Sequence, residues 1–212
     1  MSDLFYRAVR FVGTGVFFVS SRPIVIDAQF VPTSGPLIIA STHESPFDVP
    51  LLIRHTPRLV DFVSVTEVFR NPMMAWFYGN MNAFPLDRSR ADPKTVRTIL
   101  DRLAAGRAVG MFPEGGIHSG ADSLVQTGRI RKGLGRIAEL SQAPVVPCVI
   151  LNSAEYRGFV NWLPLRHVRY GMIYGPPLVP RGDPDELERE FLSEIVRLHA
   201  ILRERLDSRS IV

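Results

Sequence analysis

The sequence contains a single cysteine and no apolar run long enough to cross a bilayer. Cys148 lies inside the apolar segment 145–150. One cysteine cannot form an internal disulfide, which fits a reducing compartment, and burial is its expected fate. Zinc-ligand spacings, a helix-turn-helix pattern and aromatic–basic RNA motifs are also missing, so nucleic acid is not an expected partner.

The composition is that of a globular protein. Of the 212 residues, 46% are hydrophobic and 22% are charged, which excludes a largely disordered chain. The net charge of +4 suits anionic lipids or phosphorylated substrates. No internal repeat divides the sequence, so we expect an N-terminal segment at 1–22 followed by one domain at 23–212.

The N-terminal segment is mostly apolar between residues 4 and 19 but includes Arg7 and Arg10. It is shorter than the roughly 20 residues of a spanning helix, and no small-residue cleavage site follows it. The arginines are three apart and share a helical face. We predict a membrane-interfacial helix with its arginines at the headgroups, on the cytoplasmic face of a membrane, in a peripheral or monotopic protein. The alternative is a helix docked on the protein's own core.

Short apolar runs then alternate with helical patterns. We expect strands at 37–41, 60–65, 82–86, 108–112, 145–151 and 168–174. Asp92 and Pro93 begin a helix that Gly106 ends, and residues 184–206 form a final amphipathic helix. The alternation predicts an α/β fold with a mixed, mostly parallel sheet flanked by helices. Ligands of such sheets bind beyond the carboxyl ends of the strands.

His43 and Asp48 follow directly on the expected strand 37–41. On a continuous helix, five residues would turn the two side chains well apart. They can meet only if the chain turns between them, and Ser45 and Pro46 supply an N-cap and a first helical residue for that turn. We therefore predict a strand, a turn and a helix start, with both side chains facing one pocket.

Two further strand exits carry candidate site residues. After 108–112, Pro113 ends strand pairing and Gly115 permits a positive φ, so a turn presents Glu114. That carboxylate would bind substrate hydroxyls or cap a neighbouring helix, and the sequence leaves both open. At an earlier strand exit, Arg88 offers a guanidinium suited to phosphate, unless the loop is an ordinary solvated basic one.

Together these motifs resemble the glycerolipid acyltransferase family, the group that contains the 1-acylglycerol-3-phosphate acyltransferases. That family has a His-x4-Asp block, matched by His43 and Asp48, and a second block ending in arginine, matched by Arg88. Its third block reads Phe-Pro-Glu-Gly, as residues 112–115 do, and a fourth apolar block with a proline resembles 145–147. The blocks stand in the family's order.

The resemblance implies that 23–212 is an acyltransferase domain. Its substrates would be acyl-CoA or acyl-carrier protein and a lysophospholipid, first of all 1-acylglycerol-3-phosphate, giving phosphatidic acid in phospholipid biosynthesis. No metal or other cofactor is implied. His43 would take the hydroxyl proton, and Asp48 would hold its tautomer. Ser41 and Ser45 lack the Gly-x-Ser-x-Gly surroundings of a serine nucleophile, so we expect direct attack on the thioester.

The resemblance also assigns substrate-binding residues. Arg88 would bind the acceptor phosphate, and Glu114 with Gly115 would position the glycerol hydroxyl. Residues 72–78, Pro-Met-Met-Ala-Trp-Phe-Tyr, either line an acyl-chain groove or pack in the core.

The chain departs from the family at 116–118, where Gly-Ile-His replaces Thr-Arg-Ser. The missing arginine would help to hold a phosphate. Arg129, Arg131 or Lys132 could replace it, and Lys132, which stands before a glycine as a family lysine does, is expected to bind substrate. We expect only a structural or surface role for His118. The departure leaves open another acceptor (glycerol 3-phosphate, a lyso-ornithine lipid or a glycolipid), with a lipid esterase or thioesterase and a non-catalytic lipid-binding module as further alternatives.

Overall fold

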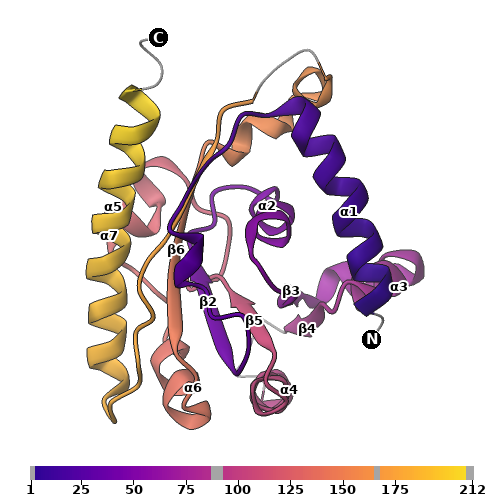
Figure 1. Ribbon diagram of the computed structural model, residues 1–212. Helices are drawn as coiled ribbons and strands as arrows, with labels where there is room; N and C mark the ends of the chain where they lie inside the picture. The colour runs from indigo at the N-terminus through magenta and orange to yellow at the C-terminus, as the bar shows by residue number, and fades with distance from the viewer. Residues whose placement is uncertain (1–2, 87–92, 165–167, 209–212) are drawn as a thin grey trace.

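The computed structural model describes residues 3–86, 93–164 and 168–208 (Figure 1). Within them, seven strands form one sheet in the order β1-β7-β6-β2-β5-β3-β4. The strands are Ile24–Ile26 (β1), Leu37–Ser41 (β2), Val60–Val65 (β3), Phe84–Leu86 (β4), Ala108–Met111 (β5), Val145–Leu151 (β6) and Gly171–Tyr174 (β7). Neighbouring strands are parallel except for β6 and β7, which are antiparallel. The predicted mixed, mostly parallel sheet is confirmed.

The strand boundaries agree with the sequence in part. Strands β2, β3 and β6 have the expected bounds, whereas β4, β5 and β7 are shorter than expected. Strand β1 was not predicted. It has three residues and pairs with β7 at the edge of the sheet, and so short a run shows no alternation of apolar and polar residues.

The helices occupy the segments between the strands. The α-helices are Asp3–Ser20 (α1), Asp48–His55 (α2), Pro72–Asn80 (α3), Pro93–Ala104 (α4), Leu124–Thr127 (α5), Leu134–Ser141 (α6) and Pro184–Ser208 (α7), and the short 3-10 helices Ser153–Arg157 (η4) and Phe159–Trp162 (η5) follow β6. Helix α4 begins at Pro93 as predicted, and Gly106 beyond its end has a φ of 72°. The expected N-cap, Asp92, lies outside the described residues.

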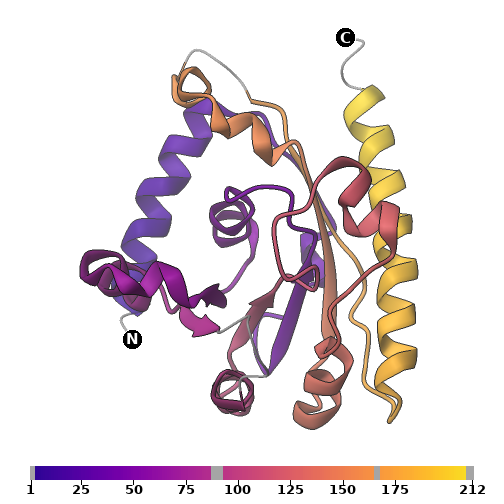
Figure 2. The same ribbon diagram turned by 180° about the vertical axis from the view of Figure 1, so that it is seen from behind.

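Helices cover the sheet on both faces because side chains alternate along each strand. On one face, Ile38 and Ala40 of β2 pack in a core with residues of α4, α6 and α7. On the other face, Leu37 and Ile39 pack with α2 and with Phe17 of α1. Figures 1 and 2 show α7 on one side of the sheet, and α2 and then α1 on the other.

Helix α1 is docked on the domain through one face only. The residues of that face are three, four or seven positions apart: Asp3, Tyr6, Arg10, Phe17 and Ser20. The guanidinium of Arg10 donates to the carbonyl of Thr56 at 2.8 Å, beyond the end of α2. The expectation that Arg10 lies at lipid headgroups is therefore wrong, because the carbonyls at a helix end attract cations. Arg7 is exposed. No helix in the described ranges is long and apolar enough to span a membrane.

Candidate active site

The site lies where two neighbouring strands end. His43 follows β2, and the Phe112-Pro113-Glu114 turn follows β5. These strands are parallel partners, with Ala40 opposite Met111, so their carboxyl ends lie side by side. Residues far apart in sequence are thereby brought to one edge of the sheet, as expected for an α/β fold.

The predicted contact between His43 and Asp48 is present. Nδ1 of His43 lies 3.0 Å from Oδ2 of Asp48, whose side chain is fully buried. A carboxylate only accepts hydrogen bonds, so Nδ1 carries the proton and donates it. Nε2 is then the basic nitrogen of the ring.

The same carboxylate oxygen shapes the turn between the two residues. Oδ2 of Asp48 accepts hydrogen bonds from the backbone N–H groups of Glu44 and Ser45, both at 2.9 Å. Helix α2 begins at Asp48 with Phe47 before it, so the prediction of Ser45 as N-cap and Pro46 as first helical residue is wrong. Residues 44–47 instead form the turn that reverses the chain. The carboxylate of Asp48 lies in the first turn of α2, where a negative charge is stabilised by the helix dipole.

The imidazole of His43 is also held by an aromatic contact. Its ring stacks on that of Phe112, with centroids 3.9 Å apart and planes inclined by 17°. Phe112 comes from the end of β5, so the ring is fixed between the two strand ends. The Phe112 contact and the Asp48 hydrogen bond together set the direction of Nε2.

Glu114 uses both carboxylate oxygens on the chain itself. Oε1 accepts from the backbone N–H of His43 at 2.7 Å, and Oε2 accepts from the N–H of Leu124, the first residue of α5, at 3.0 Å. Burial raises the pKa of Glu114, and these two N–H groups oppose the rise. These contacts match the alternative in which Glu114 caps a neighbouring helix. That Glu114 also binds substrate stays a prediction.

The third block brings a cation near the site. Gly115 has a φ of 70°, and a Cβ atom there would overlap the side chain of Arg131. The backbone N–H of Arg131 donates to the carbonyl of Pro113 at 2.8 Å, which fixes its position beside the turn. Lys132 is exposed, and Arg88 lies outside the described residues.

His118 contacts the first block through its backbone. Its N–H donates to the carbonyl of His43 at 2.8 Å, and its side chain is exposed. These contacts fit the expected structural role.

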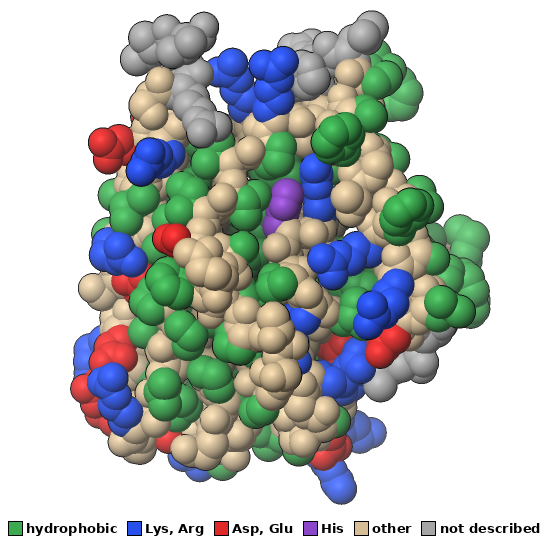
Figure 3. Space-filling view, viewed as in Figure 1, with side chains coloured by type: hydrophobic (Ala, Val, Ile, Leu, Met, Phe, Trp, Pro, Cys, Tyr) green, Lys and Arg blue, Asp and Glu red, His purple; other side chains and the backbone are tan. Residues whose placement is uncertain are grey.

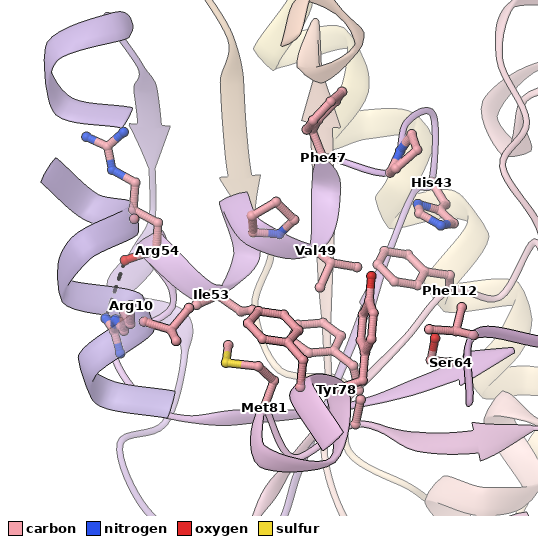
Figure 4. A pocket seen from close by; sticks show the side chains of 18 of the residues that line it. Arg10, His43, Phe47, Val49, Ile53, Arg54, Ser64, Tyr78, Met81 and Phe112 are labelled. Carbon is pink, nitrogen blue, oxygen red and sulfur yellow. Dashed lines mark hydrogen bonds between the residues drawn. The ribbon is translucent and has the colours of Figure 1, made fainter. Parts of the chain in front are cut away.

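A mostly apolar cavity of about 690 Å³ extends from His43 between α1, α2, β3 and α3 (Figure 4). Figure 4 shows His43 and Phe112 at one end, and Arg10 and Arg54 at the other. Phe77 and Tyr78 line the cavity, whereas Met73 and Trp76 of the same helix are exposed. The segment 72–78 therefore contributes to a cavity wall rather than to the closed core.

The sequence interpretation missed the part that α1 plays in this cavity. Val9, Gly13 and Phe17 line it from one face of the helix. Their spacing of four residues was a signal that this face packs inward. It was obscured because the opposite face is apolar too.

Glu44, the residue after His43, has a strongly raised pKa. Burial raises its pKa from 4.5 to about 7, and the nearby charges of Asp48 and Glu114 add to the rise. The group therefore changes charge near neutral pH, one residue away from His43.

A family model described as Acyltransferase matches residues 22–151, which include His43, Asp48 and the third block. The chain belongs to this acyltransferase family. It is 29% identical over 156 residues to the 1-acyl-sn-glycerol-3-phosphate acyltransferase of Bacillus subtilis, covering 73% of this chain and 72% of that one. A protein of the same name from Borreliella burgdorferi is 22% identical over 196 residues, covering 92% and 72%.

The fold of this acyltransferase is also that of a solved structure. The crystal structure of the 1-acyl-sn-glycerophosphate (LPA) acyltransferase PlsC from Thermotoga maritima superposes with a TM-score of 0.69 and 19% identity, covering 97% of this chain and 79% of that one. The predicted family and fold class are confirmed.

Proposed function

We propose that this acyltransferase moves a fatty acyl group from an acyl thioester to the free hydroxyl of 1-acylglycerol-3-phosphate and forms phosphatidic acid. The observation that carries the proposal is the His43–Asp48 pair at the end of an apolar cavity of about 690 Å³. A base next to a lipid-sized cavity suits a lipid hydroxyl and an acyl chain. The names of the relatives from Bacillus subtilis and Borreliella burgdorferi support the acceptor.

The reaction needs one proton acceptor and no covalent enzyme intermediate. Nε2 of His43 takes the proton of the acceptor hydroxyl as its oxygen attacks the thioester carbonyl carbon. The carbon–sulfur bond then breaks, and the thiolate leaves and receives the proton from the imidazolium. Asp48 stabilises that imidazolium through Nδ1. Acyl-CoA and acyl-carrier protein both supply such a thioester.

The acceptor phosphate requires cations near the site. Arg131 beside Gly115 is the described side chain that best fits this role, and Arg88 and Lys132 remain candidates from the sequence. Glu114 and Gly115 would then act by holding the turn that faces the acceptor. Ile117 stands where the family has an arginine, and this observation favours, as a second candidate, an acceptor with a different headgroup.

The outward face of α1 supports contact with the cytoplasmic face of a membrane. Phe11 on that face is 81% exposed, and Leu4 and Val12 are exposed with it. Apolar side chains at such positions partition into a lipid interface. A Phe11→Asp variant tests this contact, because it should reduce sedimentation with vesicles and leave the fold intact.

The decisive experiment is an acceptor panel with labelled acyl-CoA and acyl-carrier protein. We expect transfer to 1-acylglycerol-3-phosphate in preference to glycerol 3-phosphate, a lyso-ornithine lipid and a glycolipid. His43→Gln should abolish transfer, and circular dichroism checks that the variant is folded. Release of free fatty acid without any acceptor would instead identify a thioesterase, and full activity of His43→Gln would refute the mechanism.

A further inference from the structure

The mostly apolar wall of the cavity carries a phenol hydroxyl near the candidate base. Helix α3 turns Trp76 outward, and Figure 3 shows apolar side chains on the side of the molecule where α1 and α3 lie. Tyr78 of the same helix instead lines the cavity, together with His43 and Phe112. Figure 4 shows its hydroxyl directed toward the end of the cavity where His43 and Phe112 lie. A hydrogen-bond donor in this place can act on a group that His43 also reaches.

The ring of Tyr78 is held by its neighbours, whereas its hydroxyl is not. The ring packs against Phe77 with centroids 5.6 Å apart and against Phe69 at 6.4 Å. Within the described ranges, no group forms a hydrogen bond with the Tyr78 hydroxyl. The other four tyrosines of the chain all make hydrogen bonds through their hydroxyls: Tyr6, Tyr156, Tyr170 and Tyr174. The Tyr78 hydroxyl is therefore not used by the fold and is available to a ligand.

The backbone N–H groups of the turn after β2 are already used. Those of residues 43–48, with the exception of the proline, all donate within the chain, to Glu114, Asp48 or Ser45. Acyl transfer places a negative charge on the carbonyl oxygen, and preorganised donors that point at this oxygen lower the barrier strongly. Since this turn has no N–H group left to offer, the phenol of Tyr78 is the donor that the structure places toward the reacting end of the cavity.

We propose that Tyr78 is a further catalytic residue, whose hydroxyl donates a hydrogen bond to the carbonyl oxygen of the acyl thioester. The inference rests on the proposed function, because it takes the acyl chain to lie in the apolar cavity with its thioester beside His43. An acyl chain in this position displaces water from the wall, and a hydroxyl without water needs another hydrogen-bond partner. The thioester oxygen is the partner that the substrate brings to this end.

The bond acts on the charge that moves during transfer. When the lipid hydroxyl oxygen attacks the carbonyl carbon, the electron pair of the C=O double bond shifts onto the carbonyl oxygen, and the hydrogen bond from Tyr78 strengthens. The pair returns when the carbon–sulfur bond breaks. Tyr78 keeps its proton throughout, and His43 alone carries the proton from the lipid hydroxyl to the thiolate.

Tyr78→Phe tests the bond, because it removes the hydroxyl and keeps the ring. The assay uses 1-acylglycerol-3-phosphate and palmitoyl-CoA, or palmitoyl carrier protein if the wild type accepts only that donor. We expect kcat to fall about 10²-fold with little change in the KM of the donor, since the bond gains strength mainly in the transition state. The melting temperature should equal that of the wild type. A kcat within about twofold of the wild-type value would overturn the inference.

Tyr170→Phe is the matched control, because its hydroxyl belongs to the fold. That hydroxyl lies 2.7 Å from Nε2 of His55 and 3.2 Å from Nη1 of Arg54. Tyr170→Phe should therefore lower the melting temperature and leave kcat near the wild-type value, the reverse of the result expected for Tyr78→Phe. Equal losses of kcat in the two variants would point to general damage to the fold and would overturn a specific role for Tyr78.

A donor analogue without the carbonyl group separates catalysis from the shape of the cavity. An S-hexadecyl thioether of the same carrier has CH₂ in place of C=O and offers no oxygen to Tyr78. We expect it to inhibit the wild type and Tyr78→Phe equally. Weaker inhibition of the variant would show that Tyr78 only shapes the acyl site, which contradicts the proposal. A wild type that transfers to no acceptor refutes the proposed function, whereas wild-type transfer with a fully active Tyr78→Phe refutes this inference alone.

Discussion

Glu114 accepts a hydrogen bond from the backbone N–H of His43 at 2.7 Å, so the carboxylate of one motif holds the main chain of the other. Its second oxygen accepts a hydrogen bond from the backbone N–H of Leu124. An amide in its place offers one accepting oxygen, and its NH₂ group would face an N–H donor. Only a carboxylate has two oxygens that can accept both N–H groups, so an amide at position 114 would lose one of these hydrogen bonds.

Glu114→Gln should lower kcat roughly tenfold and lower the unfolding free energy by about 1–3 kcal/mol, the cost of a buried donor without a partner. Rates and thermal melts measure the two effects. Glu139→Gln is a control, because that carboxylate also accepts backbone N–H groups, from Arg181 and Gly182, but on an exposed surface. A kcat unchanged in Glu114→Gln would show that the bond to His43 does not support catalysis.

Asp48→Asn should reduce kcat by about 10²- to 10⁴-fold, because a neutral amide cannot stabilise the imidazolium. The second oxygen, Oδ1, is buried without a hydrogen-bond partner in the described part of the chain, so an amide NH₂ placed there gains no acceptor. Steady-state kinetics give the loss, and circular dichroism checks that α2 still forms. A variant with wild-type kcat would mean that Asp48 only orders the turn.

Gly115→Ala should raise the KM for the phosphorylated acceptor about tenfold, the equivalent of one charge-assisted hydrogen bond, because its Cβ displaces Arg131. Gly128→Ala is a matched control. Gly128 has a φ of 62° with open space around it, so both variants carry backbone strain of roughly 1–2 kcal/mol but only one moves the arginine. Similar KM values for the two variants would argue against Arg131 as a phosphate ligand.

Glu44 should make stability fall as pH rises. Its pKa is about 7 in the folded protein and 4.5 without burial, so the folded chain binds more protons between these values. Replacing it by Gln should raise the melting temperature above pH 7 by about 2 °C, a modest gain because the group is partly solvated, and change nothing below pH 4. Melts across pH 4–9 test this, with the exposed Glu155→Gln expected to follow the wild-type profile.

Asp61→Ala should lower the unfolding free energy by about 3–5 kcal/mol, since it removes the buried carboxylate that pairs with two half-buried guanidiniums. Asp61 is fully buried and lies 2.7 Å from Arg102 and 2.6 Å from Arg107. Asp3, whose side chain is 46% exposed, pairs with the same Arg107 at 3.1 Å, and Asp3→Ala should cost less than about 1 kcal/mol. Denaturant titrations compare the two, and equal losses would contradict this ranking.

The sequence predicted much of the fold because its signals were local. The apolar runs of β2, β3 and β6 were sufficient for their bounds, Pro93 marked the start of α4, and the amphipathic pattern placed α7 to within two residues of its end. Helix α2 started later than expected because Asp48 binds the N–H groups of Glu44 and Ser45, a contact that no capping pattern reveals.

The site was predictable as a set of residues but not as a set of contacts. The bond between Glu114 and His43 joins segments 71 positions apart, and pattern alone left Glu114 undecided between a cap and a ligand. The approach of Arg131 to Gly115 was equally hidden, because it depends on how the chain returns after α5. Lys132, the substrate-binding candidate from the pattern, follows Arg131 directly, and both residues are exposed.

The bond between His43 and Glu114 also bears on how the protein folds. It closes a loop of 71 positions, and the pairing of β2 with β5 brings its two ends together. Closing so long a loop costs chain entropy, and the assembled sheet offsets that cost, so the active geometry depends on the pairing of β2 with β5. A partly folded chain that lacks β5 would hold His43 and Asp48 but could not carry out acyl transfer.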